Sequence, residues 1–181
     1  DVAVPEVLAL VGIYLKQARH ANALRVLEAT KFRFTDAGLG DLYCFWMGQV
    51  LAIAGQFSEA IATANDIVED AERTTLITVI LKNQARLTGE TTELEEHLAT
   101  EWERTSDKAL LLELCDLRAY LDKWDFIADK GTTLLDSIDT TYTVKLVLMS
   151  LYKTRKYSEF LNLARQVEHI WPENMQPPDI R

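Results

Sequence analysis

The sequence predicts an all-α protein, built from antiparallel helix pairs that repeat along the chain. Three observations support this fold class. Apolar residues recur at helical spacing in one segment after another. Proline, which interrupts helices, is absent between Val7 and Trp171. A helix–turn–helix pattern also returns at intervals of about 34 residues.

The clearest unit lies between Asp41 and Ala71. Its first half carries an apolar stripe at positions i, i+3, i+4 and i+7, formed by Cys44, Met47, Gly48 and Leu51. Gly55 then breaks the pattern, as a turn glycine does. The second half carries another helical stripe, formed by Phe57, Ala60, Ile61, Ala64, Ile67 and Val68.

Gly48 lies inside the first predicted helix of this unit. Glycine in an exposed helix costs about 1 kcal/mol relative to alanine. We therefore expect a neighbouring helix to approach closely at Gly48. The small residues Ala60 and Ala64 on the second helix fit a tight antiparallel hairpin.

The repeat can be followed through the residue that lies three positions after the start of each predicted second helix. These residues are Ala23, Ala60, Leu94, Ile127 and Phe160. Their residue numbers differ in turn by 37, 34, 33 and 33. A helix pair of about 34 residues is the period of tetratricopeptide repeats.

The unit resembles a tetratricopeptide repeat in Gly48, in the turn Gly55-Gln56-Phe57 and in Ala60. Similar features elsewhere are Tyr14, Ala23 and the ending I-W-P-E-N. The chain departs from the family where Cys44 and Ala64 replace aromatic residues, and where Lys82 and Phe160 replace small ones. The resemblance implies a right-handed α-solenoid, a superhelix whose first helices line a concave groove.

The predicted organisation is a single helical-repeat domain, 1–171, followed by an extended tail, 172–181. Its five units are 5–30, 41–71, 74–104, 107–138 and 140–171. The first spacing is longer than the others, and we place its extra residues in a loop between Lys31 and Gly40.

Two helix starts and one bend can also be predicted. Thr92 with Glu95 forms a capping box, Ser106 or Asp107 caps the next helix, and Gly131 bends the helix that contains it.

Composition and charge narrow the classes of function. Apolar residues make up 48% of the 181 residues, which excludes a disordered chain. The formal net charge of −9 disfavours nucleic acid and anionic membrane surfaces, because both ligands need a basic face. No apolar run approaches the length of a transmembrane helix, which is roughly 18 residues or more. The chain begins at Asp1 without a signal peptide, which favours an excised domain or a mature product.

Cys44 and Cys115 lack metal-binding spacing and lie in apolar helical stripes. We expect buried free thiols, which fits a reducing, cytoplasmic location. The histidines His20, His97 and His169 have no ligand spacing, and no nucleophile-elbow or phosphate-binding motif is present. We therefore expect no enzyme activity, no metal and no cofactor.

The predicted first helices carry a second stripe beyond the one that packs. By the family resemblance these positions face the groove and contact a protein or peptide partner. The candidate contact residues are Phe45, Trp46, Gln49, Asn83, Arg86, Asp116, Lys145, Met149 and Tyr152. The alternative for Phe45 and Trp46 is burial between units. An acidic peptide is not expected, because only Asn83, Arg86 and Lys145 could grip one.

Three functions remain open at this point. The first is a protein-interaction scaffold that binds a peptide segment or a neighbouring domain. The second is a self-association or interdomain spacer module of a larger polypeptide, with a homo-oligomer left open. The third is an RNA-binding helical repeat, which the net charge disfavours.

Overall fold

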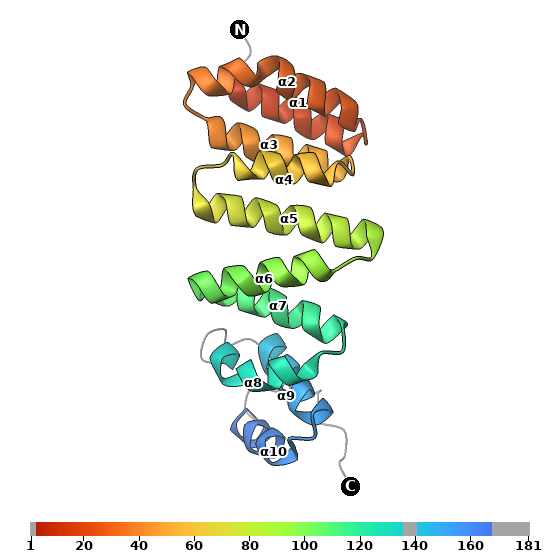
Figure 1. Cartoon of the computed structure of the whole chain (residues 1–181), viewed down its shortest axis with the longest axis vertical. Helices are drawn as coiled ribbons and strands as arrows, with labels where there is room; N and C mark the ends of the chain where they lie inside the picture. Colours follow the sequence, from red (N-terminus) through yellow and green to blue (C-terminus); the bar gives the residue numbers. More distant parts are fainter. Residues whose placement is uncertain (1–2, 136–140, 168–181) are drawn as a thin grey trace. The chain divides into compact units, whose positions relative to one another are not determined.

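A computed structural model describes residues 3–135 and 141–167 of the chain, and in this part it contains ten α-helices and no strand (Figure 1). The all-α class is confirmed. The helices are α1 (Val4–Lys16), α2 (His20–Asp36), α3 (Gly40–Ile53), α4 (Phe57–Asn65), α5 (Asp70–Thr88), α6 (Thr92–Thr105), α7 (Lys108–Tyr120), α8 (Trp124–Leu135), α9 (Thr141–Lys153) and α10 (Tyr157–Gln166).

The chain forms two compact units, residues 1–94 and 95–181, and the boundary falls inside α6. In the first unit α1 packs on α2, α2 on α3, and α3 on both α4 and α5. In the second unit α7 packs on α8, α8 on α9, and α9 on α10. In both units, helices therefore pack mainly on neighbours along the chain.

The turns within the expected helix pairs repeat one backbone conformation. A residue with positive φ follows the first helix each time, at Ala18, Gly55, Gly89, Asp122 and Arg155. Their residue numbers differ in turn by 37, 34, 33 and 33, which matches the spacing found in the sequence.

Four of these five turns, all except the one at Gly89, also share their hydrogen bonds. After α3, for example, Gln56 N–H donates to Leu51 O at 2.9 Å and Gly55 N–H donates to Ala52 O at 3.1 Å. This pair of bonds is a Schellman motif, which satisfies carbonyl groups at a helix C-terminus. The turn at Gly38, between α2 and α3, has the same pair of bonds, so this motif ends most first helices but is not confined to them.

Gly48 lies where three helices of the first unit meet. A Cβ atom added at Gly48 would lie 2.8 Å from Leu76 Cδ2 on α5 and 3.5 Å from Ala60 O on α4. The expected close approach at Gly48 is confirmed, and α5 takes part in it as well as α4. The pairs Asp41–Glu69 and Gly48–Leu76 share an offset of 28 residues, so α3 and α5 run parallel.

Gly131 has a similar role in the second unit. A Cβ atom at Gly131 would lie 2.8 Å from Val147 Cγ1 on α9. Helix α8 continues through Gly131 to Leu135. Gly131 therefore has a packing role, because α9 needs the space that a side chain would fill.

The loop expected between Lys31 and Gly40 is wrong for most of its length, because α2 continues to Asp36. Ala23, Leu27 and Phe34 are fully buried on one face of this longer helix. The Phe34 ring meets Tyr43 of α3 edge-on at 5.6 Å between ring centres. This contact stabilises the extra turns of α2.

Two further boundaries differ from the expectation. Helix α4 ends at Asn65 and α5 begins at Asp70, so Ile67 and Val68 lie in the connection rather than on a helical stripe.

The predicted capping box of Thr92 and Glu95 is also wrong. The backbone N–H and the hydroxyl of Thr92 both donate to Glu90, at 3.1 and 2.6 Å. Asp107, in contrast, caps α7 as expected and accepts from Ala109 N–H at 2.8 Å.

The end of the predicted fifth unit falls outside the described residues. This applies to His169, Trp171 and Pro172, and to the predicted tail 172–181.

Candidate functional site

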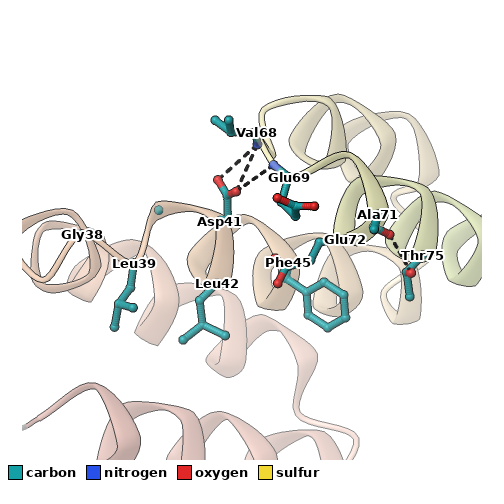
Figure 2. A pocket seen from close by; sticks show the side chains of 11 residues that line it. Gly38, Leu39, Asp41, Leu42, Phe45, Val68, Glu69, Ala71, Glu72 and Thr75 are labelled. Carbon is teal, nitrogen blue, oxygen red and sulfur yellow. Dashed lines mark hydrogen bonds between the residues drawn. The ribbon is translucent and has the colours of Figure 1, made fainter.

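A pocket of about 860 Å³ lies in the first unit, between the start of α3 and the connection from α4 to α5 (Figure 2). Three segments line it: the turn before α3, the first part of α3, and the start of α5 with the residues before it. The lining residues are Gly38, Leu39, Gly40, Asp41, Leu42, Phe45, Val68, Glu69, Ala71, Glu72 and Thr75.

The carboxylate of Asp41 fixes the geometry of this pocket. It accepts hydrogen bonds from Val68 N–H at 3.2 Å and from Glu69 N–H at 3.1 Å, which Figure 2 shows as dashed lines. These donors precede α5, where no residue of the same helix can accept from them. Asp41 on α3 therefore caps α5 across the pocket, and this explains why α5 begins at Asp70.

One side of the pocket is apolar. Leu39, Leu42 and Phe45 project from the same side of the start of α3 in Figure 2. Leu42 and Phe45 are half-buried against two parts of the core, whereas Leu39 is 38% exposed. Val68 is 84% exposed, so its side chain adds almost nothing to the folded core. The pocket therefore offers apolar surface that the fold does not use.

The other side is acidic. Asp41, Glu69 and Glu72 line the pocket, and none of its lining residues is Lys, Arg or His. A helix N-terminus carries about half a positive charge, and the pocket borders the N-termini of α3 and α5. Three carboxylates with two such helix ends leave a net charge of about −2. The electrostatic potential in the pocket is therefore negative.

The other predicted contact residues of the first unit lie outside this pocket. Trp46 is half-buried and packs against the core of α1, α2 and α3, which agrees with the burial alternative for this residue. Gln49 is half-buried on α3. Arg86 Nη2 lies 3.4 Å from Asn83 Oδ1, so these two polar side chains contact each other on α5.

The remaining predicted residues belong to the second unit. Asp116 accepts a hydrogen bond of 2.7 Å from the Tyr142 hydroxyl, and this bond raises the pKa of Tyr142 to about 12. Lys145 is half-buried, while Met149 and Tyr152 are about half exposed, at 48% and 53%.

Tyr152 belongs to an aromatic group in the second unit. Its ring lies 6.1 Å from Tyr157 and 6.2 Å from Phe160, measured between ring centres. Tyr157 is also 53% exposed. The second unit therefore presents aromatic surface on α9 and α10.

Both cysteines are free thiols, as expected, but only Cys115 is fully buried. Burial raises the pKa of Cys115 to about 12, and the neighbouring Asp116 carboxylate adds to this effect. Burial also raises the pKa of the half-buried Cys44. Neither thiol has the lowered pKa of a reactive cysteine.

Of the predicted contact residues, the structure places only Phe45 at the pocket. Sequence reasoning missed the residues of the α4–α5 connection because Val68 fits a helical stripe. A signal was nevertheless present, since four acidic residues, Asp66, Glu69, Asp70 and Glu72, surround Val68 closely. Carboxylates this close together favour solvent exposure over a buried helical stripe.

In the part of the chain that the structure describes, no cluster of His, Cys, Asp and Glu could hold a metal ion. None of the described helices is both long and apolar enough to cross a bilayer.

The chain matches no protein-family model, no curated protein and no solved structure. The class that its fold defines is an all-α protein of consecutively packed helices.

Proposed function

We propose that this chain is a protein-interaction module of the tetratricopeptide type, which binds a peptide segment or a neighbouring domain. The observation that carries the proposal is the recurring left-handed turn, which returns at intervals of about 34 residues. A positive-φ residue recurs in five successive helix pairs, and four of these turns share the same hydrogen bonds. Such a recurrence is typical of helical-repeat proteins, whose extended surfaces bind other chains.

The packing inside the first unit supports the same proposal. Helix α3 contacts the preceding α2, its hairpin partner α4 and the following α5. Its parallel course with α5 is the stacking of successive first helices that a solenoid requires. Gly48 allows this stacking because it has no side chain at the crossing.

We place the binding surface of the first unit at the pocket beside Phe45. Its apolar side chains are open to a partner, while Asp41 holds the two sides in place. Preorganised apolar surface of this kind is a common feature of binding sites. Trp46 supports the surface from the core side rather than contacting the partner.

Self-association is a second candidate function, favoured by the exposed aromatic group of the second unit. Tyr152 and Tyr157 are each 53% exposed and lie against each other on α9 and α10. Tyrosine is enriched in protein interfaces. Light scattering over a concentration series tests this function, because only self-association makes the measured mass rise with concentration.

Site-directed photo-cross-linking tests the main proposal. A benzophenone amino acid replaces Val68 at the pocket or Leu87 at the end of α5; both residues are exposed and apolar, and Leu87 does not line the pocket. We expect one partner to cross-link at position 68 and not at position 87 in an extract of the cells that make the protein. Equal cross-linking at both positions, or none, would contradict the proposal.

A further inference from the structure

The pocket beside Phe45 combines apolar side chains with carboxylates that have no basic neighbour in its lining. We propose that it binds a peptide segment in which an apolar residue is flanked by lysine or arginine. This inference rests on the proposed function and names the chemistry of the partner.

The apolar part of the ligand follows from the exposed side chains. Leu39 and Val68 are 38% and 84% exposed, and the half-buried Leu42 and Phe45 add further apolar side chains to the lining. A leucine-sized side chain fits easily within about 860 Å³ and covers part of this apolar surface. Val68 has almost no packing role in the fold, and contact with the ligand gives its exposed side chain a function.

The cationic part follows from the carboxylates. Asp41 uses its oxygen atoms to cap α5, but its charge remains beside the pocket. Glu69 and Glu72 lie at the start of α5 on the pocket side, whereas the neighbouring Asp70 forms an ion pair with Arg73. A lysine or arginine of the ligand thus meets two carboxylates that line the pocket, while an acidic ligand is repelled by a net charge of about −2.

Charge also separates this ligand from other occupants. A nucleic acid brings phosphate groups and so meets the same repulsion. A second copy of this chain carries a net charge of −9, which opposes close approach unless a local basic segment docks. A segment of another protein with basic and apolar residues together satisfies both sides of the pocket.

The test is a titration of the full-length, nitrogen-15-labelled chain with three short peptides of equal length. Their central residues are arginine–leucine–arginine, arginine–serine–arginine or glutamate–leucine–glutamate, between identical glycine–serine flanks. We expect the first peptide to shift the amide signals of Val68, Glu69 and Thr75, and to bind at least about tenfold more tightly than the other two. Raising the salt from about 0.15 M to about 0.5 M should weaken this binding.

A pair of matched variants separates the pocket carboxylates from general charge. The double variant Glu69→Gln, Glu72→Gln should weaken binding of the arginine–leucine–arginine peptide about three- to tenfold. The control is Glu59→Gln, which removes an exposed carboxylate from the first turn of α4, outside the pocket. This control should change the affinity less than twofold. The amide spectrum of each variant shows whether it is folded.

Several results would overturn the proposal. These are equal binding of all three peptides, no binding at millimolar concentration, or equal losses in the double variant and the Glu59 control. Shifts at residues 68–75 that depend on protein concentration alone would identify a second copy as the occupant. If a partner cross-links at position 68 but no peptide preference appears, only the ligand chemistry fails. If neither appears, the interaction function fails as well.

Discussion

The guanidinium group of Arg118 lies 3.8 Å from the centre of the Phe126 ring, so α7 and α8 are joined by a cation–π contact. The same side chain donates from Nε to Glu95 Oε1 at 3.0 Å, and Lys123 Nζ donates to Glu95 Oε2 at 2.6 Å. Arg118 and Glu95 are mostly buried, with side chains 20% and 15% exposed. Arginine is seldom this buried unless it is paired, and this network supplies its partners.

Replacing Arg118 should destabilise the second unit. We expect Arg118→Ala to lower the free energy of unfolding by about 2–3 kcal/mol, because it removes the cation–π contact and leaves Glu95 with one cation. Arg118→Lys should recover only part of this loss, since lysine lacks the planar group that stacks on Phe126. Urea unfolding measures both variants.

The matched control for this prediction is Arg104→Ala. Arg104 pairs with Glu101 on the same helix and its side chain is 46% exposed. The control should change stability by less than about 0.5 kcal/mol. Equal effects of the two alanine variants would show that the Arg118 network does not stabilise the unit.

The stability contributed by Glu95 should depend on pH. Burial alone would raise the pKa of Glu95, but the hydrogen bonds and charges of Lys123 and Arg118 outweigh it and hold the pKa below its ordinary value. Because the folded-state pKa is lowered, the contribution is complete above the unfolded-state pKa of about 4.3 and is lost as the pH falls further.

The measurement is urea unfolding of the parent and of Glu95→Gln between pH 7 and pH 3. The parent should be more stable at pH 7, and the difference should shrink below about pH 4.3. Glu59→Gln serves as the exposed control and should show a much smaller change. A difference that stays constant down to pH 3 would contradict the assigned role of Glu95.

Gly48 should tolerate a methyl group far better than a larger side chain. The clash of an added Cβ atom is with the end of the Leu76 side chain, which can shift, and alanine favours helix by about 1 kcal/mol. We expect Gly48→Ala to change stability by less than about 1 kcal/mol. Gly48→Leu should cost about 2–3 kcal/mol through overpacking against Leu76.

Gly12 on α1 provides the control for the Gly48 series, since a Cβ atom there would meet nothing within 4 Å. Both Gly12→Ala and Gly12→Leu should leave stability unchanged or raise it slightly. If Gly48→Leu unfolds like the parent, α3 and α5 do not cross at Gly48.

Trp46 should behave as a core residue. It is half-buried against the core of α1, α2 and α3, so Trp46→Ala should cost about 2 kcal/mol, less than the roughly 3–5 kcal/mol of a fully buried tryptophan. Phe32, which is 56% exposed, is the control and should cost less than about 1 kcal/mol when replaced by alanine. A Trp46→Ala variant as stable as the parent would return Trp46 to the list of partner contacts.

Local signals in the sequence predicted much of the fold. Helical stripes and the turn at Gly55 depend on residues close in the chain, and the spacing of the turns agrees with the structure. The errors lie where distant residues decide. Asp41 caps α5 from 28 residues away, and Phe34 extends α2 by packing on Tyr43.

The candidate site was harder to predict for the same reason. Phe45 is a conspicuous aromatic residue on a first helix, and it does line the pocket. Val68 and Glu69 are held at the pocket by backbone hydrogen bonds to Asp41, which is distant in the sequence. The apolar pattern alone cannot show that α4 ends early and leaves Val68 exposed.

The central claim is that the apolar surface at Val68 serves binding rather than folding. Val68→Ser tests it most directly, with the affinity for the cross-linked partner and the unfolding free energy measured on the same samples. We expect stability within about 0.5 kcal/mol of the parent and affinity reduced about tenfold. Leu87→Ser, an exposed change outside the pocket, should alter neither. Unchanged affinity for Val68→Ser, or an equal loss for Leu87→Ser, would contradict the claim.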